Sequence, residues 1–342
     1  MSHHQQLVAN RARRPRQGLT LIEVLVVIGI MVMLAAIAIP AALSAREQAR
    51  RGVCATNLRQ MTLACHAFAS ARGGFPGDGN GTAVRGVQNP SLLSAQALLL
   101  PHLDQAALFN TINGQVPLGP SMEAGGANFT ATSMLLGTFV CPSDPWTHGR
   151  RLAPNSYRVN VGGYRIRTLR VVGLERRFEV THDGAFAPYR LVRLGEFSDG
   201  TSNTLAISEK PVGSGPGRPY SAFRDWVQYI HADGVDSSDA WAAECARRST
   251  ESARDSRVSL EQGGSWLPPG GVMTAFTPIL PPNSPVPDCS QVEHGFAGAH
   301  VARSYHSGGV NASMADGSVR WFSSSIDPRV WRDLGTRTSQ RR

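Results

Sequence analysis

The sequence predicts an α+β protein in which a long N-terminal helix packs on an antiparallel β-sheet domain with long loop insertions. Three patterns point to this class. Residues 24–39 form an apolar run without a charged residue. Apolar residues then recur at helical spacing as far as residue 68. From residue 73 onward, short strand-like runs alternate with segments rich in glycine, proline and serine.

The apolar run is long enough to cross a membrane. A helix from Leu19 to Ile39 rises about 1.5 Å per residue and is about 31 Å long, which matches the hydrocarbon core of a bilayer. The segment before it contains four arginines and no acidic residue: Arg11, Arg13, Arg14 and Arg16. By the positive-inside rule, the N-terminus is cytoplasmic. We therefore expect a single-pass inner-membrane protein whose C-terminal domain is periplasmic or on the cell surface.

One carboxylate interrupts the start of this span. At the centre of a membrane helix an ionised Glu23 would cost on the order of 2.5–3.5 kcal/mol, and less near the end, so it needs a partner. The segment 18–23, Gly-Leu-Thr-Leu-Ile-Glu, resembles the processing site of type IV prepilins and pseudopilins. The resemblance implies that residues 1–18 are a leader, that a prepilin peptidase cuts after Gly18, and that the new N-terminus at Leu19 is methylated. It also implies that Glu23 meets the α-amino group of a neighbouring pilin-like subunit.

Two simpler explanations of the N-terminus remain open, a secretory signal peptide and a plain anchor. Residues 36–38, Ala-Ile-Ala, could serve as a signal-peptidase site. However, the apolar run exceeds the usual 7–15 residues of a signal peptide, and a signal peptide has no use for Glu23. Leu19 stands where pilins usually have phenylalanine, which is a mild departure. We favour pilin-type processing.

The helix is expected to continue beyond the membrane, with residues 19–39 in lipid and residues 40–72 amphipathic. A stripe of apolar residues recurs at spacings of 4, 3, 4 and 3: Cys54, Leu58, Met61, Cys65 and Phe68. Pro40 falls where pilin helices commonly carry a proline. Glycines at 73, 74 and 77 then end the helix. The apolar stripe predicts a packing partner, which we expect to be the sheet.

Residues 73–342 are expected to form the exported, β-rich domain. A short helix is predicted over 91–110, with Pro101 as an interruption, and strand-like runs cover 164–173, 186–197 and 204–209. Residues 211–295 are expected to be surface loops, because 211–219 and 263–288 are rich in proline, glycine and serine. A C-terminal hairpin is predicted over 309–324. Its turn pair, Asp316 and Gly317, favours type I′ geometry.

The hairpin carries a second resemblance. His306, nine intervening residues, and then Asp316-Gly317 resemble the C-terminal signature of a bacterial family of exported, pilin-leader proteins whose domain has no known function. Residues 54–60 with His66, 139–145 and 197–204 resemble other blocks of that family. The resemblance spans nearly the whole chain and is weakest over 211–295. It implies a pseudopilin-like protein and assigns no activity.

The five cysteines are expected to meet an oxidising compartment after export. Cys54 and Cys65 lie eleven residues apart, which is about 16 Å along a helix, so they cannot bridge each other. Among the possible pairings we favour Cys54 with Cys141 and Cys245 with Cys289, leaving Cys65 as a buried thiol. There is no Cys-x-x-Cys pair, so we do not expect a structural zinc site.

Charge argues against a nucleic-acid partner. The net charge is +9, but four positive charges belong to the leader, which leaves +5 on residues 19–342. The arginines form no long basic run beyond the leader, and Lys210 is the only lysine. A dispersed set of arginines does not predict a phosphate-binding surface.

Catalytic and metal sites are likewise not expected. Ser202, Ser208, His306 and Asp316 could be drawn as a triad, but the chain has no G-x-S-x-G nucleophile motif. His294, His300 and His306 recur every six residues, which spaces them about 20 Å apart along a strand. Asp199 and Asn203 offer oxygen ligands for calcium, although a solvated turn explains them as well. We expect no cofactor.

Together these observations predict a non-enzymatic structural subunit, or a minor component, of a pilus-like or type II secretion-like assembly. Its expected partners are a prepilin peptidase, other pilin-like subunits that contact the N-terminal helix, and the membrane. The alternative is a membrane-tethered, extracytoplasmic binding module for a saccharide or another solute, which would use residues 211–295. An assembly subunit requires Glu23 and processing at Gly18, whereas a tethered binder requires only an anchor and a pocket.

Overall fold

The computed structural model describes residues 20–79, 93–116, 121–169, 177–215, 217–219, 221, 223–229, 238–249, 258–259, 262–291 and 298–338. The chain divides into two compact units, Met1–Gln48 and Ala49–Arg342. Gly18 and Leu19, the two residues of the expected processing site, lie outside the described residues.

A single long helix, α1 (Leu21–Arg72), belongs to both units. Its apolar part has a mean hydropathy of 2.9 over 18 residues, none of them buried, so by length and composition it can cross a membrane. Pro40 lies inside the helix and does not end it. All five residues of the predicted apolar stripe in the second half, from Cys54 to Phe68, are buried. The two halves therefore differ: the first is apolar and exposed, and the second buries one face.

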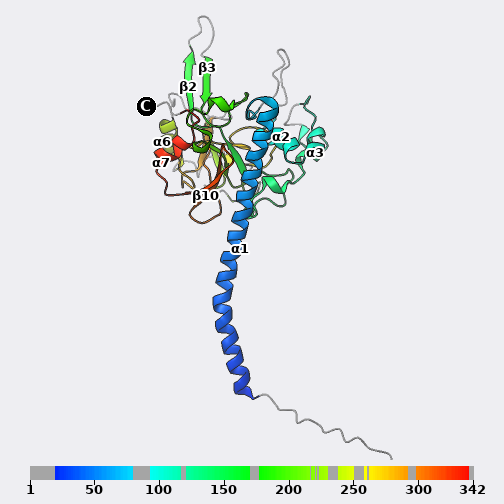
Figure 1. Ribbon diagram of the computed structural model, residues 1–342, viewed down its shortest axis with the longest axis vertical. Helices are drawn as coiled ribbons and strands as arrows, with labels where there is room; N and C mark the ends of the chain where they lie inside the picture. Colours follow the sequence, from blue (N-terminus) through cyan, green and yellow to red (C-terminus); the bar gives the residue numbers. More distant parts are fainter. Residues whose placement is uncertain are drawn as a thin grey trace, which may run out of the picture. The chain divides into compact units, whose positions relative to one another are not determined.

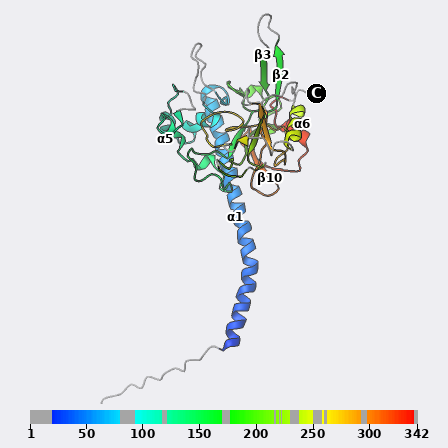
Figure 2. The same cartoon turned by 180° about the vertical axis from the view of Figure 1, so that it is seen from behind.

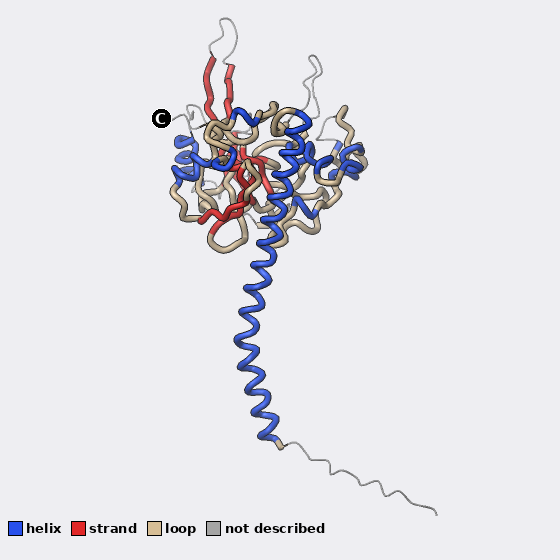
Figure 3. Tube along the Cα trace, in the orientation of Figure 1, coloured by secondary structure: helices blue, strands red, loops and turns tan. Residues whose placement is uncertain are grey.

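The described residues of the second unit include three sheets. The largest has the strand order β11-β10-β4-β1-β7, and a smaller one has the order β6-β5-β8-β9. Strands β2 and β3 pair as a hairpin that projects from the domain (Figure 3). The strands are β1 (Tyr157–Asn160), β2 (Tyr164–Leu169), β3 (Arg177–His182), β4 (Leu205–Glu209), β5 (Trp226–Tyr229), β6 (Val258–Ser259), β7 (Ala275–Phe276), β8 (Asp288–Gln291), β9 (Gly298–Ala299), β10 (Gly309–Met314) and β11 (Val319–Ser323).

Short helices surround these sheets. They are α2 (Ala95–Leu99), η1 (Leu100–His102), α3 (Ala106–Asn110), α5 (Phe129–Thr132), η2 (Gly137–Phe139), η3 (Leu194–Glu196), η4 (Thr201–Asn203), α6 (Ser238–Ser249) and α7 (Pro328–Leu334). Within the second unit, α2 and α3 lie on one side of α1 and α6 and α7 on the other (Figure 1), and the opposite view agrees (Figure 2).

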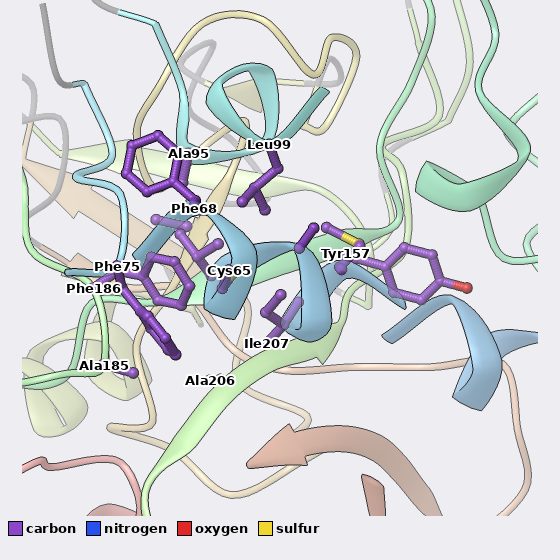
Figure 4. Packing of buried hydrophobic residues seen from close by; sticks show 14 of the residues in the cluster. Cys65, Phe68, Phe75, Ala95, Leu99, Tyr157, Ala185, Phe186, Ala206 and Ile207 are labelled. Atoms are coloured by element: carbon purple, nitrogen blue, oxygen red, sulfur yellow. The ribbon is translucent and has the colours of Figure 1, made fainter. Parts of the chain in front are cut away.

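The C-terminal half of α1 packs on the largest sheet. Thr62 Oγ1 donates a hydrogen bond to Ser313 Oγ in β10 over 2.7 Å. Asn57 Nδ2 lies 3.2 Å from the hydroxyl of Tyr157 in β1. Figure 4 shows the apolar contact, in which Cys65 and Phe68 of α1 face a cluster that includes Ile207 of β4. Burial of this face supplies the hydrophobic stabilisation that holds the helix to the sheet.

The structure corrects the expected sheet type. The largest sheet is mixed, because β7 pairs with β1 in parallel. In the smaller sheet, β8 likewise pairs with β5 in parallel. A parallel pair needs a long connection, and more than a hundred residues separate β1 from β7. Most of the second half of that connection is predicted to be loop, so local sequence patterns do not indicate that β1 and β7 pair.

Two local expectations also differ from the structure. Residues 211–295 contain β5, α6, β6, β7 and β8 rather than loops alone. Residues 186–197 form isolated bridges and the 3₁₀ turn η3 rather than a strand. The interruption predicted at Pro101 in the helix over 91–110 is confirmed. The described residues form α2, the 3₁₀ helix η1 that contains Pro101, and α3, because proline removes one backbone donor and clashes with the preceding turn.

The C-terminal hairpin forms in the predicted place with a different turn. Gly317 has φ +91°, whereas Asp316 is not among the described residues with positive φ, so the turn is not type I′. The N–H of Gly317 donates to the carbonyl of Met314 over 3.0 Å, and the N–H of Met314 donates to the carbonyl of Ser318 over 2.8 Å. This is the three-residue hairpin loop in which one left-handed glycine closes the turn.

We expect Gly317→Val to destabilise the domain by at least about 1–2 kcal/mol, because a β-branched residue strongly disfavours positive φ. A Cβ at this position would meet only Leu63 Cδ2, at 3.8 Å, so the cost is conformational and not steric. The matched control is Gly195→Val, since Gly195 has an ordinary φ and a Cβ there would meet no heavy atom within 4 Å. Urea unfolding of the full-length protein in detergent micelles measures both. Equal stability of the two variants would contradict this expectation.

Candidate functional site

The N-terminal end of α1 holds a carboxylate in a local hydrogen-bonded arrangement. Glu23 Oε2 accepts hydrogen bonds from the backbone N–H and the hydroxyl of Thr20, each over 2.8 Å. The Thr20 hydroxyl oxygen in turn accepts from the N–H of Glu23 over 3.4 Å. This reciprocal pattern is a capping box, which satisfies backbone donors at a helix start. Among the described residues, the partner of Glu23 is therefore Thr20, which donates hydrogen bonds and carries no charge.

The helix after Glu23 exposes a continuous apolar surface. Its large apolar side chains between Leu21 and Ile39 are 43–79% exposed. Apolar patches of this extent on a soluble protein mark contact with a membrane or another chain. The site residues Glu23 and Thr20 lie at the start of this surface. A cation presented by a second chain in the same apolar layer would meet Glu23 in a low-dielectric environment, where the attraction is strong.

Four buried side chains meet inside the second unit: Cys54, Cys141, Glu209 and His306. One potential ligand atom of each lies within 4.8 Å of those of the other three. His306 Nε2 is 3.2 Å from Glu209 Oε1 and 3.7 Å from Cys141 Sγ. A disulfide joins Cys54 to Cys141. We call this group the His306 cluster.

The elements of the His306 cluster come from distant parts of the chain. Cys54 lies on α1, Cys141 follows η2, Glu209 ends β4, and His306 lies in the segment before β10. Backbone pairing fixes these positions, because β4 is hydrogen-bonded to β10 on one side and to β1 on the other. The cluster thus ties the helix to the middle of the largest sheet.

Glu209 is held rigidly. Its Oε2 accepts from the backbone N–H of Asn311 over 2.7 Å, and its Oε1 accepts from Asn311 Nδ2 over 3.0 Å. Tyr157 is the register partner of Glu209 in β1. Burial raises the pKa of Tyr157, and the negative charge of Glu209 raises it further, so this phenol stays protonated. Glu209 therefore has few rotamers available and presents the same oxygen to His306.

His306 and Asp316, which the sequence analysis grouped by resemblance, have different surroundings. His306 is buried in the cluster, whereas Asp316 is exposed in the hairpin turn. Asp316 Oδ1 accepts from the N–H of Ser318 over 2.9 Å and from its hydroxyl over 2.7 Å. Burial would raise the pKa of Asp316, but these hydrogen bonds outweigh it and lower the pKa. Asp316 therefore stabilises the turn, and His306 belongs to the interior.

The sequence blocks grouped by resemblance meet in space. The N–H groups of Ala315 and Asp316 donate to the carbonyls of Thr204 and Thr201, over 2.8 and 3.1 Å. His66 Nε2 lies 2.8 Å from the carbonyl oxygen of Ala315. The blocks at 54–66, 139–145, 197–204 and 306–318 thus form one connected region of the domain.

A second buried group carries charge. The carboxylate of Asp288 pairs with Lys210 Nζ and Arg303 Nη1, and it accepts from Gln262 Nε2 over 2.7 Å and from the N–H of Val301 over 3.1 Å. Burial would raise the pKa of Asp288, but the two cations outweigh it and lower the pKa. Burial lowers the pKa of Lys210 to about 7. We call this group the Asp288 network. It joins Lys210, the residue directly after β4, to Asp288, the first residue of β8.

The other cysteines are also buried in the domain. A disulfide links Cys245 in α6 to Cys289 in β8, so both links match the pairs favoured from the sequence. Cys65 is a free, buried thiol. Burial raises the pKa of Cys65 well above its usual range, which keeps the thiol protonated and unreactive.

The residues considered for a triad have separate contacts. Ser208 Oγ donates to the carbonyl of Asn311 over 3.5 Å. Asp316 faces Ser318, as described above, and His306 faces Glu209. Ser202 lies in η4. These contacts join Ser208, Asp316 and His306 to three different partners.

The other metal candidates are placed as follows. Asn203 Nδ2 donates to the carbonyl of Asp199 over 3.0 Å, which makes this segment a side-chain-closed turn. His300 is buried, and burial lowers its pKa to about 4, so it is neutral near pH 7. His294 lies outside the described residues.

Glu209 was not among the candidate site residues predicted from the sequence. The one sign of it is its position: it ends a strand-like apolar run and directly precedes the only lysine.

Comparison with known protein families finds two family models that match the chain. A model described as "Protein of unknown function (DUF1559)" matches residues 43–329. A model described as "Prokaryotic N-terminal methylation motif" matches residues 13–39. No curated protein and no solved structure matches the chain. The methylation motif and the long apolar helix fit a single-pass, membrane-anchored, exported protein, and the motif implies processing by a prepilin peptidase and a pilin-like assembly.

Proposed function

The chain belongs to the DUF1559 family of proteins of unknown function, and from that premise we propose that it is a structural, non-enzymatic subunit or minor component of a pilus-like or type II secretion-like assembly. The observation that carries the proposal is Glu23, which lies inside the methylation motif and at the start of an exposed apolar helix. The N-terminus lies in the cytoplasm and residues 73–342 lie in the periplasm or on the cell surface, in keeping with the four leader arginines.

Charge pairing explains why a subunit would keep Glu23. A carboxylate in an apolar layer is costly, and hydrogen bonds from Thr20 reduce that cost without neutralising the charge. The methylated amino group at Leu19 of an adjacent subunit supplies the missing cation. A buried ion pair of this kind does little for net stability but strongly specifies the register of two helices. The proposal therefore predicts that Glu23 acts between chains.

The domain supports a structural role. The His306 cluster and the Asp288 network are both buried, so their charged groups act within the fold. The groups considered for a catalytic triad have separate contacts. Disulfides at 54–141 and 245–289 suit a domain that works outside the cytoplasm.

The test is crosslinking in membranes. A Leu25→Cys variant carries a reporter cysteine on the exposed apolar surface, and copper-catalysed oxidation traps neighbouring helices as dimers. In this background we expect Glu23→Gln to reduce dimer yield roughly tenfold. That change corresponds to a loss of about 1.4 kcal/mol in the free energy of association between the helices. Leader cleavage and membrane insertion stay unchanged, because they act on single chains.

The matched control is Glu123→Gln, which removes an exposed carboxylate outside α1 and should retain the full dimer yield. If Glu23→Gln and Glu123→Gln give equal yields, the protein is a simple tether, and the binding-module alternative takes the place of the assembly subunit.

A further inference from the structure

The His306 cluster contains two functional groups, a carboxylate and an imidazole, that a disulfide does not require. Two cysteines suffice to crosslink α1 to the segment after η2. The structure nevertheless also buries a carboxylate and an imidazole against the sulfurs, with all four ligand atoms within 4.8 Å of one another. Burial of a carboxylate costs several kcal/mol of desolvation, which is offset here by two hydrogen bonds from Asn311 and by the contact with His306. The crosslink itself needs neither group, and with the two sulfurs they form a set of four potential metal ligands.

We propose that, when Cys54 and Cys141 are reduced, their thiolates bind one Zn²⁺ together with Glu209 and His306. Thiolate sulfur, imidazole nitrogen and carboxylate oxygen are each ligands that Zn²⁺ binds in proteins, and four such donors fill a tetrahedral coordination sphere. The disulfide and the metal are alternative crosslinks of the same two cysteines. Either one holds α1 to β4 and to the segment before β10.

The distances fit a tetrahedral site. Zinc bonds of about 2.0–2.1 Å to nitrogen and oxygen and about 2.3 Å to sulfur give tetrahedral edges of about 3.3 Å between N and O and about 3.6 Å between N and S. The observed separations are 3.2 Å from His306 Nε2 to Glu209 Oε1 and 3.7 Å from His306 Nε2 to Cys141 Sγ. The two sulfurs must move apart once their bond is reduced, and the other ligand atoms already lie within 4.8 Å of one another.

The surroundings resemble those of a supported metal site. Asn311 holds both oxygens of Glu209, and Ser304 Oγ accepts from the backbone N–H of His306 over 3.1 Å. Contacts of this kind orient the ligands before the metal arrives. Binding releases the two thiol protons to solvent, and no electron is transferred. Reduction of the disulfide is a separate, earlier step, in which a phosphine takes up oxygen from water and leaves two thiols.

The experiment uses the full-length chain in detergent micelles and Co²⁺ as the spectroscopic probe. The protein is reduced anaerobically with a phosphine and incubated with Co²⁺ until the absorbance is constant, because a buried site loads slowly. We expect one Co²⁺ per chain, with thiolate-to-cobalt charge-transfer bands and the intense d–d bands of a tetrahedral site, and loss of these bands when Zn²⁺ is added. Protein that retains its disulfide should give no bands.

Variants separate this site from adventitious thiol binding. Glu209→Gln and His306→Gln each remove one ligand and should weaken Co²⁺ binding at least tenfold, while circular dichroism shows whether the fold persists. The paired control Cys245→Ala/Cys289→Ala removes the other disulfide and should retain the bands. Absence of bands from the reduced wild-type protein would overturn the proposal. Bands of unchanged affinity in both ligand variants would overturn it as well.

Discussion

Gly18→Val is expected to leave essentially all of the protein as an uncleaved precursor in the membrane. The methylation motif spans residues 13–39, and Gly18 immediately precedes the expected mature N-terminus at Leu19. A residue without a side chain lets the peptide backbone approach a peptidase closely, and a β-branched valine prevents this. Intact-mass analysis of membrane-extracted protein reports cleavage and methylation in one measurement.

Leu19→Phe is the matched control for that experiment. Phenylalanine is the residue that pilins usually carry after the cut, so cleavage should proceed as in the wild type. A wild-type mature form that begins near Ile39 would instead identify an ordinary signal peptide. In that case the role assigned to Glu23 would have no basis, since the residue would be removed with the leader.

Asp288→Asn is expected to cost about 3–5 kcal/mol of unfolding free energy, the usual penalty for removing one partner of a buried ion pair. The change leaves Lys210 and Arg303 buried without their counter-charge. Lys210 limits the damage, because burial already lowers its pKa to about 7 and the amine can lose its proton. Urea unfolding of the full-length chain, followed by tryptophan fluorescence, measures the loss.

Asp239→Asn is the control for Asp288→Asn. Asp239 also pairs with an arginine, Arg332, but its side chain is 71% exposed. Exposed pairs contribute at most about 1 kcal/mol. A similar cost for both substitutions would show that the buried network is not what stabilises the fold.

The pH dependence gives a second check on the Asp288 network. Because the two cations hold the pKa of Asp288 below its unfolded value, the stabilisation is present above about pH 4 and is lost as the pH falls through the folded pKa. The stability difference between wild type and Asp288→Asn should therefore shrink in acid. A difference that stays constant from neutral to strongly acidic pH would contradict this assignment.

Local patterns predicted the parts of the fold that local forces determine. The buried stripe from Cys54 to Phe68 follows from helical periodicity alone. Strand β4 and the hairpin of β10 and β11 appear where apolar alternation and an Asp-Gly pair place them. The predicted type I′ turn was wrong. Backbone hydrogen bonds to Thr201 and Thr204 shape this hairpin loop, in addition to the preferences of Asp316 and Gly317.

Features that depend on distant contacts could not be predicted from local patterns. Strand β7 has two residues and lies in a segment rich in proline and glycine, so its sequence does not indicate a strand. Parallel pairing with β1 stabilises its extended conformation. Glu209 becomes part of a candidate site only because the fold brings β4 next to α1 and to the segment before β10, which contains His306. Spacing along the helix excluded a bridge between Cys54 and Cys65, but it gave no sign of the carboxylate and imidazole that lie beside Cys141.

The burial of Lys210 has a consequence for chemical labelling. Lys210 is the only lysine in the chain, and it is 1% exposed. Amine-reactive reagents can therefore reach only the N-terminal amino group while the domain is folded. Acylation of Lys210 reports molecules that have opened, and labelling at the terminus reports whether that amine is free or shielded by a neighbour. One reagent and one peptide map thus measure domain opening and terminal occupancy in the same sample.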